Sequence, residues 1–262
     1  MTTVLSISSQ KGGVGKTDLC VNLASFLSSM GHKTLLLDLD PQSNATDYLI
    51  ENRPTLSSAD LLLDDTLDLP QVITNTEFEN LDIIPAHLSL SGAGVRLASD
   101  VDMQFKLRNK LTGLESYEYV LIDTPPTLGF LTINALTASD EVIIPMQAQY
   151  FAMDGVTQLI DTVNKIRSNL NTKLNIRGIV LTLYDRRTIL SKQVREQAQN
   201  EFRGIVFDTV IPVNVRLAES PSYHKPIMVY SPNSTGAKAY MELTNEFLGT
   251  NQKLEVMQEL IQ

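Results

Sequence analysis

Short apolar runs alternate with stretches of helical periodicity along most of the chain. Residues 33–40 (KTLLLDLD) form a continuous apolar run, which is typical of a strand buried on both faces of a parallel sheet. Residues 17–30 instead place large apolar side chains at helical spacing, and Gly31 is a natural helix end. The same two patterns predict further strands at 3–9, 81–86, 117–123, 141–146, 176–183 and 205–212. They predict further helices at about 89–112, 131–138, 154–168 and 189–202.

This alternation predicts the fold class. Strands that alternate with helices indicate an α/β fold with a doubly wound, mostly parallel β-sheet and helices on both faces. No internal repeat and no low-complexity linker interrupts the 262 residues, so we expect a single domain over residues 1–262. A helical tail is predicted from about residue 236 to residue 262.

A glycine-rich segment follows the first predicted strand. Residues 10–17 read QKGGVGKT and lead directly into a predicted helix. The segment is close to the P-loop pattern GxxxxGK[ST], with Gln10 at the first glycine position. A glycine-rich turn without a ligand is the competing interpretation, but strand, loop and helix are all in register for phosphate binding. Backbone N–H groups at the start of a helix can face the phosphates of a nucleotide, here from Gly12, Gly13, Val14 and Gly15.

Five polar side chains near this loop and at two strand ends predict the rest of the site. Lys16 can neutralise the β- and γ-phosphate oxygens, and the hydroxyl of Thr17 can bind Mg²⁺. Asp123 ends an apolar strand, as a Walker B acid does. Asp38 and Asp40 end another strand and, being two residues apart, are expected on the same side of it. The sequence therefore predicts a magnesium site formed by Thr17 and these carboxylates, the carboxylates acting through water.

Charge is unevenly distributed along the chain. The net charge of −9 argues at first against a nucleic-acid partner. Residues 165–225, however, carry eleven lysines and arginines against five acids, so this window has a surplus of six positive charges. Such a basic stretch is a candidate electrostatic footprint, although several of its residues are expected to be solvated helix faces.

Other features exclude several classes of protein. The single cysteine, Cys20, excludes a disulfide framework and is interpreted as a small buried apolar side chain. His32, His87 and His224 show no ligand spacing, so no zinc site is predicted. The N-terminus lacks the apolar region of a signal peptide, and no apolar run approaches the ~18–20 residues of a membrane span. We expect a soluble, cytoplasmic protein.

Several motifs together resemble a known family. Residues 11–17 (KGGVGKT), with the additional lysine Lys11, resemble the deviant Walker A motif of the ParA/MinD superfamily. Four further segments are similar to motifs of chromosomal Soj-like ParA partition ATPases: DLDPQSNAT, IDTPPTLGFLTINAL, LTLYDRRTILSKQV and IPVNVRLAESPSYHKPI. The resemblance spans residues 1–240, nearly the whole chain. It implies a slow ATP hydrolase that uses Mg²⁺ and whose ATP-bound sandwich dimer binds double-stranded DNA non-specifically.

The resemblance also implies roles for individual residues. Lys11 would reach the phosphates of the other subunit, and it joins Lys16 and Asp40 as a catalytic residue. Asp40 would orient the attacking water, while Asp38 would support the metal shell. A ParB-like protein or another cargo adaptor would stimulate hydrolysis and reset the dimer. Association with the nucleoid follows from such DNA binding.

Two pairs of residues in the second half of the chain match binding segments of the family. Pro212 and Asn214 match the segment that holds the adenine. Arg187 and Arg216 match arginines that contact DNA in Soj-like proteins. Both arginines lie in the basic window, which is independent support for their role.

One position departs from the family pattern. Thr17 is usually followed by threonine or serine, and here it is followed by Asp18. An ionised aspartate can only accept hydrogen bonds. Two unit charges ~4 Å apart at a near-surface dielectric repel by about 4 kcal/mol, which exceeds the ~0.3–1 kcal/mol that Asp18 gains from the helix dipole. We expect Asp18 to lie in the ATP site and to weaken the affinity for ATP.

Two alternative functions remain open. A nucleotide-gated binding switch with little hydrolysis would follow if Asp18 disables the site. A MinD-like positioning ATPase would need a membrane-binding helix at the C-terminus. Residues 253–262 do carry an apolar stripe, but their polar face holds Glu255 and Glu259 against Lys253 alone, and an anionic membrane would repel it. Stable membrane binding is therefore not expected.

Overall fold

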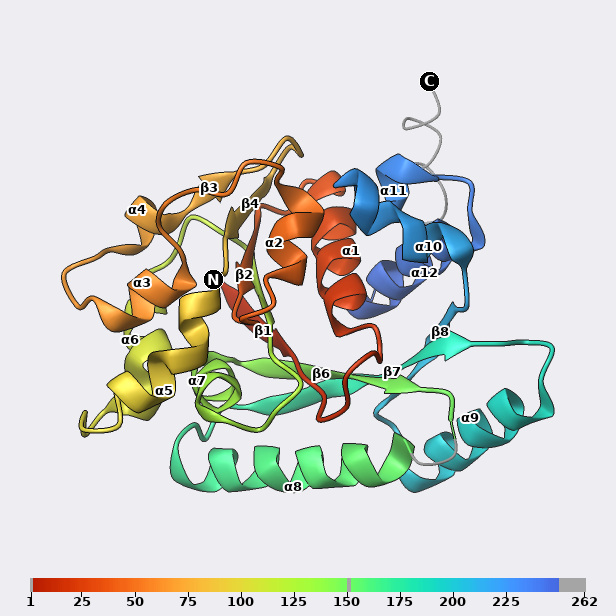
Figure 1. The fold of residues 1–262 in the computed structure, drawn as a ribbon. Coiled ribbons are helices and arrows are strands. Elements are labelled where there is room, and N and C mark those ends of the chain that lie inside the picture. The colour runs from red at the N-terminus through yellow and green to blue at the C-terminus, as the bar shows by residue number, and fades with distance from the viewer. Residues whose placement is uncertain (1, 150–151, 250–262) are drawn as a thin grey trace.

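The computed structural model describes residues 2–149 and 152–249, and within them one eight-stranded sheet forms the centre of the molecule. Its strand order is β3-β4-β2-β5-β1-β6-β7-β8 (Figure 1). Neighbouring strands are parallel except for the short β3, which pairs antiparallel with β4. The strands are β1 (Thr3–Ile7), β2 (Thr34–Asp38), β3 (Thr74–Asn75), β4 (Leu81–Ile84), β5 (Tyr119–Asp123), β6 (Glu141–Gln147), β7 (Asn175–Tyr184) and β8 (Val206–Pro212).

Helices connect these strands and cover both faces of the sheet (Figure 1). The α-helices are α1 (Lys16–Ser29), α2 (Asn44–Leu49), α3 (Ser58–Leu63), α4 (Leu69–Val72), α5 (Ala93–Arg96), α6 (Lys106–Leu111), α7 (Phe130–Ala138), α8 (Ala152–Asn169), α9 (Ile189–Glu201), α10 (Val215–Glu219), α11 (Ile227–Tyr230) and α12 (Thr235–Leu248). Short 3-10 helices are η1 (Leu88–Gly92), η2 (Met103–Phe105) and η3 (Ser220–Tyr223). None of the helices in the described ranges is long and apolar enough to cross a membrane.

Alternating side chains of the strands pack into separate cores on the two faces of the sheet. Leu36 of β2 packs with α1, α2, α11 and α12, whereas its neighbours Leu35 and Leu37 pack with α3, α5, α6 and α7. A third core joins β6 and β7 to α8 and α9. Because every residue of β2 is buried, the uninterrupted apolar run at this strand reflects burial on both faces, as the sequence predicts. The predicted α/β fold class is confirmed.

The strand order places the carboxyl end of β1 at the middle of the sheet. β1 lies between β5 and β6, and the chain leaves it through the glycine-rich loop into α1. Asp123 at the end of β5 is in register with Ile7 of β1 and with Asp38 of β2. Open α/β sheets bind ligands where the strand order reverses, which is this position.

Two local expectations need correction. The helix expected over 89–112 is instead four short helical pieces (η1, α5, η2 and α6), joined by turns. Gly94 of α5 packs so closely on α7 that a Cβ there would lie 3.0 Å from Phe130. The expected tail helix begins as α12 and ends at Gly249, whose positive φ of 68° closes the helix. The part of the expected tail beyond residue 249 lies outside the described residues.

Candidate functional site

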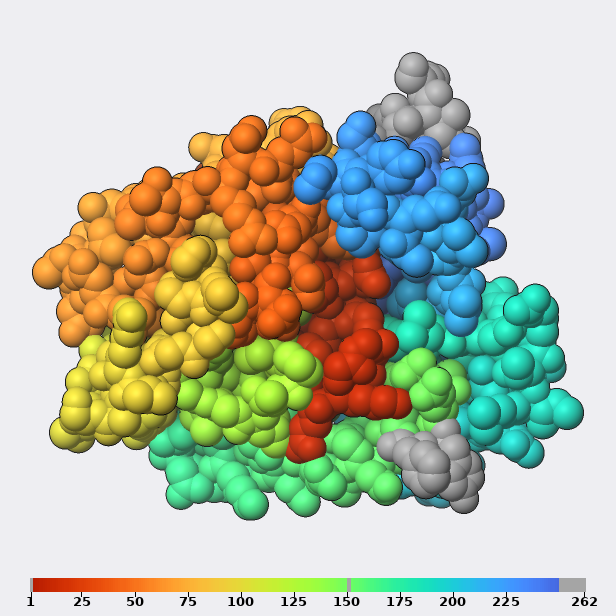
Figure 2. All heavy atoms as spheres, viewed as in Figure 1, coloured from red at the N-terminus to blue at the C-terminus, as the bar shows by residue number. Residues whose placement is uncertain are grey.

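The glycine-rich loop between β1 and α1 has the backbone geometry that the sequence predicts. Gly13 and Gly15 adopt positive φ values of 72° and 79°, which glycine reaches without strain. A Cβ atom added at Gly12 or Gly13 would meet nothing within 4 Å, so an open space lies in front of the loop. In Figure 2 the red segment that contains the loop reaches the surface between the orange, yellow-green and blue parts of the chain.

A hydrogen bond from β7 fixes the middle of this loop. The hydroxyl of Thr182 donates to the carbonyl oxygen of Val14 at 2.8 Å, and both residues are buried. The carbonyl oxygen of Thr182 in turn accepts from the N–H of Ala148 after β6. The loop is therefore attached to the centre of the sheet and not only to its two flanking elements.

Lys16 is buried at the start of α1, beside two carboxylates. Its Nζ lies 3.5 Å from the carbonyl oxygen of Lys11, so the side chain folds back along the loop. Burial lowers the pKa of Lys16, and the negative charges of Asp123 and Asp40 oppose that shift. A buried ammonium group aimed along a glycine-rich loop is well placed to neutralise phosphate oxygens.

Thr17 and Asp123 form the second half of the site. The hydroxyl of Thr17 donates to Oδ2 of Asp123 at 2.7 Å, although the two residues lie 106 positions apart. The other oxygen, Oδ1, is buried and has no hydrogen-bond partner. Burial raises the pKa of Asp123 well above its usual value, and the nearby charge of Asp38 raises it further. An unsatisfied buried carboxylate oxygen of this kind is costly unless a cation or water occupies the space before it.

Asp38 and Asp40 lie close together, but not for the reason the sequence suggested. β2 ends at Asp38, so Asp40 belongs to the following turn, in which its N–H donates to Oδ1 of Asp38 at 3.0 Å. Thr46 donates to Oδ2 of Asp38 through both its N–H and its hydroxyl. Burial nevertheless raises the pKa of Asp38 to about 7. The backbone N–H of Gln42 donates a hydrogen bond to Oδ1 of Asp40.

These residues fit a hydrated magnesium ion better than a directly chelated one. In the described part of the chain no three His, Cys, Asp or Glu side chains converge to hold a metal ion. The free Oδ1 of Asp123 and the hydroxyl of Thr17 still provide oxygen ligands beside the open loop. Mg²⁺ keeps several of its waters and binds through few protein oxygens plus phosphates, so the role of each carboxylate toward the metal stays a prediction.

The side chain of Lys11 points away from the phosphate loop of its own chain. Its Nζ points to the side-chain oxygens of Gln147 and Gln149, at 3.4 and 3.0 Å, and the residue is exposed. No pattern in the sequence indicated these two glutamine contacts. An exposed ammonium group beside the loop is available to a second molecule.

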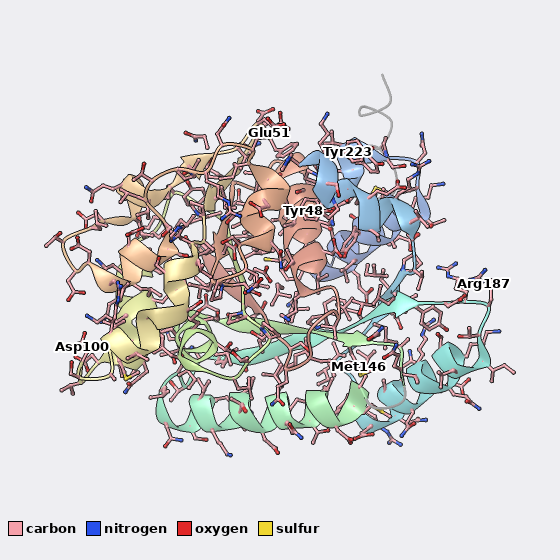
Figure 3. The ribbon with its side chains drawn as sticks, viewed as in Figure 1. Tyr48, Glu51, Asp100, Met146, Arg187 and Tyr223 are labelled. Carbon is pink, nitrogen blue, oxygen red and sulfur yellow. The ribbon has the colours of Figure 1, made fainter. Side chains whose placement is uncertain are left out.

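Asp18 lies in the first turn of α1, close to tyrosines from two other helices. Burial raises the pKa of Asp18 to about 6, and a hydrogen bond from Tyr48 opposes the shift. Burial raises the pKa of Tyr240 in α12, and the charge of Asp18 raises it further. Tyr48 also exchanges a hydrogen bond with Ser220 of η3, inside the molecule beside α1 (Figure 3). The sequence pattern revealed neither tyrosine as a neighbour of Asp18.

The two residues expected at the adenine occupy the end of β8 and the turn after it. Asn214 caps α10, its Oδ1 accepting from the N–H of Arg216 at 2.8 Å. Pro212 lies opposite Tyr184 of β7 and lines a cavity of about 520 Å³. Arg187 lines the same cavity, so the structure brings one predicted nucleotide contact close to one predicted DNA contact.

The two arginines predicted to contact DNA lie in neighbouring connections. Arg187 belongs to the β7–α9 connection and points away from the molecule at its edge (Figure 3). Arg216 belongs to α10, which follows the adjacent strand β8. The side chain of Arg187 is 87% exposed and that of Arg216 is 58% exposed. Both are therefore accessible to a phosphate backbone.

The fold and the loop together define the class: the chain is a P-loop nucleotide-binding protein with a parallel α/β sheet. A family model described as an AAA domain matches residues 2–176. The sporulation initiation inhibitor protein Soj of Bacillus subtilis (strain 168) is 46% identical over 249 residues, covering 94% of this chain and 98% of that protein. The chromosome partitioning protein ParA of Caulobacter vibrioides (strain NA1000 / CB15N) is 42% identical over 252 residues, covering 94% and 93%.

A solved structure has the same fold over nearly the whole chain. The crystal structure of cobyrinic acid a,c-diamide synthase from Mycobacterium smegmatis, with bound ADP and magnesium, matches with a TM-score of 0.83 and 31% identity. The match covers 95% of this chain and 94% of that one. With the two relatives above, the particular family is clear: the chain belongs to the Soj-like ParA proteins of the ParA/MinD superfamily.

Proposed function

We propose that this protein is a partition ATPase, which hydrolyses ATP with Mg²⁺ and uses the cycle to move DNA or another cargo. One observation carries the proposal: Thr17 and the unsatisfied Asp123 carboxylate lie beside buried Lys16 at an open glycine loop. The names of the relatives, Soj and ParA, support a role in chromosome partitioning. The whole chain would act as one ATPase domain.

The residues of the site divide the work of hydrolysis between them. Lys16 and the loop N–H groups bind the phosphates, and Mg²⁺ supplies charge neutralisation at their oxygens when it is bound. Asp123 and Asp38 would hold Mg²⁺ through water. Asp40, fixed by the N–H of Gln42, orients the attacking water. Exclusion of bulk water by the second subunit would complete the site.

The exposed position of Lys11 supports an ATP-dependent dimer. Its side chain rests on Gln147 and Gln149 and is not committed to the phosphates of its own chain. In a two-fold dimer, Lys11 of each subunit can approach the phosphates bound by the other, as an arginine finger does. We infer that ATP drives dimerisation for this reason.

The arginine-bearing connections support a DNA surface in that dimer. Arg187 and Arg216 each occur twice, so the dimer offers at least four arginines to the phosphate backbone. Further basic side chains, among them Arg186, Lys192 and Arg195, line a cavity of about 480 Å³ at the same edge. Phosphate contacts carry no base code, so binding would be non-specific and would retain the protein on the nucleoid. A ParB-like or other cargo adaptor would then stimulate hydrolysis.

The proposal is tested by ATP turnover and by DNA binding on the same preparation. We expect slow turnover that DNA and an adaptor accelerate, and no turnover at all would favour a binding switch without hydrolysis. Filter binding to two unrelated duplexes should show equal affinities in ATP, weak binding in ADP, and a log–log salt slope of about −0.9 per phosphate neutralised.

Arginine variants locate the DNA surface. R187A and R216A should each reduce the salt slope, whereas R108A, which removes an exposed arginine of α6, should not. A strong preference for one duplex, or tight binding in ADP, would contradict a non-specific surface that depends on the ATP dimer.

A further inference from the structure

The guanidinium of Arg187 is paired with a carboxylate of its own loop through one of its edges. Its Nε donates to Oδ1 of Asp185 and its Nη2 donates to Oδ2, both at 2.9 Å. The backbone N–H of Arg187 also donates to Oδ1, at 3.0 Å, so the carboxylate sits in a short turn that fixes its position. The two side chains form a planar fork-to-fork pair at the surface.

Arg216 is held in a similar way by a different element. Its Nη1 donates to Oε2 of Glu219, three residues further along, at 2.9 Å. The hydroxyl of Tyr230 in α11 donates to the same oxygen at 2.9 Å, which fixes the glutamate from its other side. Both arginines predicted to contact DNA are therefore paired with a local carboxylate.

Other basic side chains near the β7–α9 connection are not paired with an acid in the described part of the chain. Arg186, the immediate neighbour of Arg187, and Lys192 of α9 have no ion-pair partner within 4.0 Å among the described residues. Among these basic side chains, the paired ones are thus the two predicted to contact DNA, although Arg53 and Arg177 elsewhere in the described residues are paired with acids as well. One pair lies in the β7–α9 connection and the other in α10.

A carboxylate offsets the positive charge with which an arginine attracts a phosphate. Arg187 uses Nε and one N–H of Nη2 for Asp185, so its remaining N–H groups can still meet a phosphate, but the charge behind them is partly neutralised. The arginine lowers the pKa of Asp185 to about 2, so the acid stays ionised near neutral pH and protonation does not release the arginine. Only a competing anion or a movement of the loop can do so.

We propose that Asp185 and Glu219 lower the DNA affinity of this protein, because each offsets the charge of an arginine that contacts DNA phosphates. The inference rests on the proposed function, in which Arg187 and Arg216 contact DNA. Each carboxylate weakens the attraction between its arginine and a single phosphate. Tight DNA binding then requires several arginines to act together, as a dimer allows.

The test uses neutral variants of the two acids on the full-length protein. D185N keeps an oxygen for the turn, and E219Q keeps one for Tyr230, while both remove the charge that holds the arginine. D65N is the matched control, because Asp65 is an exposed acid paired with Lys106 of α6, outside the arginine-bearing loops. Filter binding across a salt series, with a non-hydrolysable ATP analogue, compares all three with the wild type.

We expect D185N and E219Q each to tighten DNA binding about two- to fivefold at low salt, the range that relief from one exposed ion pair allows. The salt slope should steepen by up to about 0.9 for each phosphate newly neutralised. D65N should change neither quantity. Combining D185N with R187A should abolish the gain, because the arginine that the acid restrains is then absent.

Three results would overturn the inference, and they are distinct from failure of the proposed function. Unchanged or weaker binding by D185N and E219Q, with R187A still reducing wild-type binding, would leave the DNA surface standing and refute the role of the acids. Equal tightening by D65N would assign the effect to net charge alone. A gain by D185N that persists in the R187A background would show that the acid repels DNA directly. If no variant bound DNA, the proposed function and the inference would both fall.

Discussion

The hydrogen bond from Thr182 to Val14 gives a direct test of how the sheet holds the phosphate loop. T182V replaces the hydroxyl by a methyl group of similar size and leaves the buried Val14 carbonyl without its side-chain donor. Loss of a partner by a buried polar group costs about 1–3 kcal/mol. The lost hydrogen bond holds the phosphate loop against β7. The variant should therefore have both a lower free energy of unfolding and a lower affinity for nucleotide.

The cost of the lost hydrogen bond can fall on nucleotide binding, on folding, or on both. If the whole cost fell on the binding of Mg²⁺ and ADP, the dissociation constant would rise by about 5- to 150-fold. If it fell only on folding, the free energy of unfolding would drop by about 1–3 kcal/mol with the dissociation constant unchanged. Urea unfolding without nucleotide and calorimetric titration with nucleotide measure the two parts separately.

The control is a threonine whose hydroxyl also donates to a backbone carbonyl oxygen, but at the exposed surface. Thr162 in α8 donates to the carbonyl of Gln158 at 3.0 Å on an exposed surface, so T162V should change unfolding by less than about 0.5 kcal/mol. Equal effects of T182V and T162V would refute the reasoning, since burial of the Val14 carbonyl would then be irrelevant. Unchanged nucleotide affinity in a destabilised T182V would limit the role of Thr182 to folding.

Three further predictions concern the nucleotide site. Light scattering with a non-hydrolysable ATP analogue should show a doubled mass, and K11A should stay monomeric; a dimer of K11A would exclude the lysine as the link between subunits. D40A should bind ATP and dimerise without turnover, whereas K16A should lose nucleotide binding; wild-type turnover of D40A in a phosphate-release assay would remove Asp40 from the catalytic residues. D18T should bind ATP up to ~10-fold more tightly if one pKa-scale unit of repulsion is relieved, and equal affinities in calorimetry would mean that the carboxylate near Tyr48 lies too far from the phosphates.

Local patterns in the sequence determined the parts of this protein that depend on sequence neighbours. The buried run at β2 and the glycines of the loop between β1 and α1 follow from side-chain periodicity and from the backbone freedom of glycine. The carboxylates at the ends of β2 and β5 could be expected at one edge of the sheet, because parallel strands end together. The expected helix over 89–112 was wrong because its serines and glycines form weak helices, and packing of α5 against α7 decides the path instead.

Only the tertiary structure decided which side chains meet across long stretches of chain. Thr17 contacts Asp123, and Thr182 holds Val14, over separations of 106 and 168 residues. The periodicity of apolar residues cannot predict such pairs. It indicates the face of an element on which a side chain lies, but not which distant residue packs against that face. The acids that restrain Arg187 and Arg216 are close in sequence, yet their hydrogen-bonded geometry depends on side-chain rotamers and, for Glu219, on a tyrosine from another helix. The site was therefore predictable where it follows from the chain's own pattern, and it was not where it depends on contacts that folding creates.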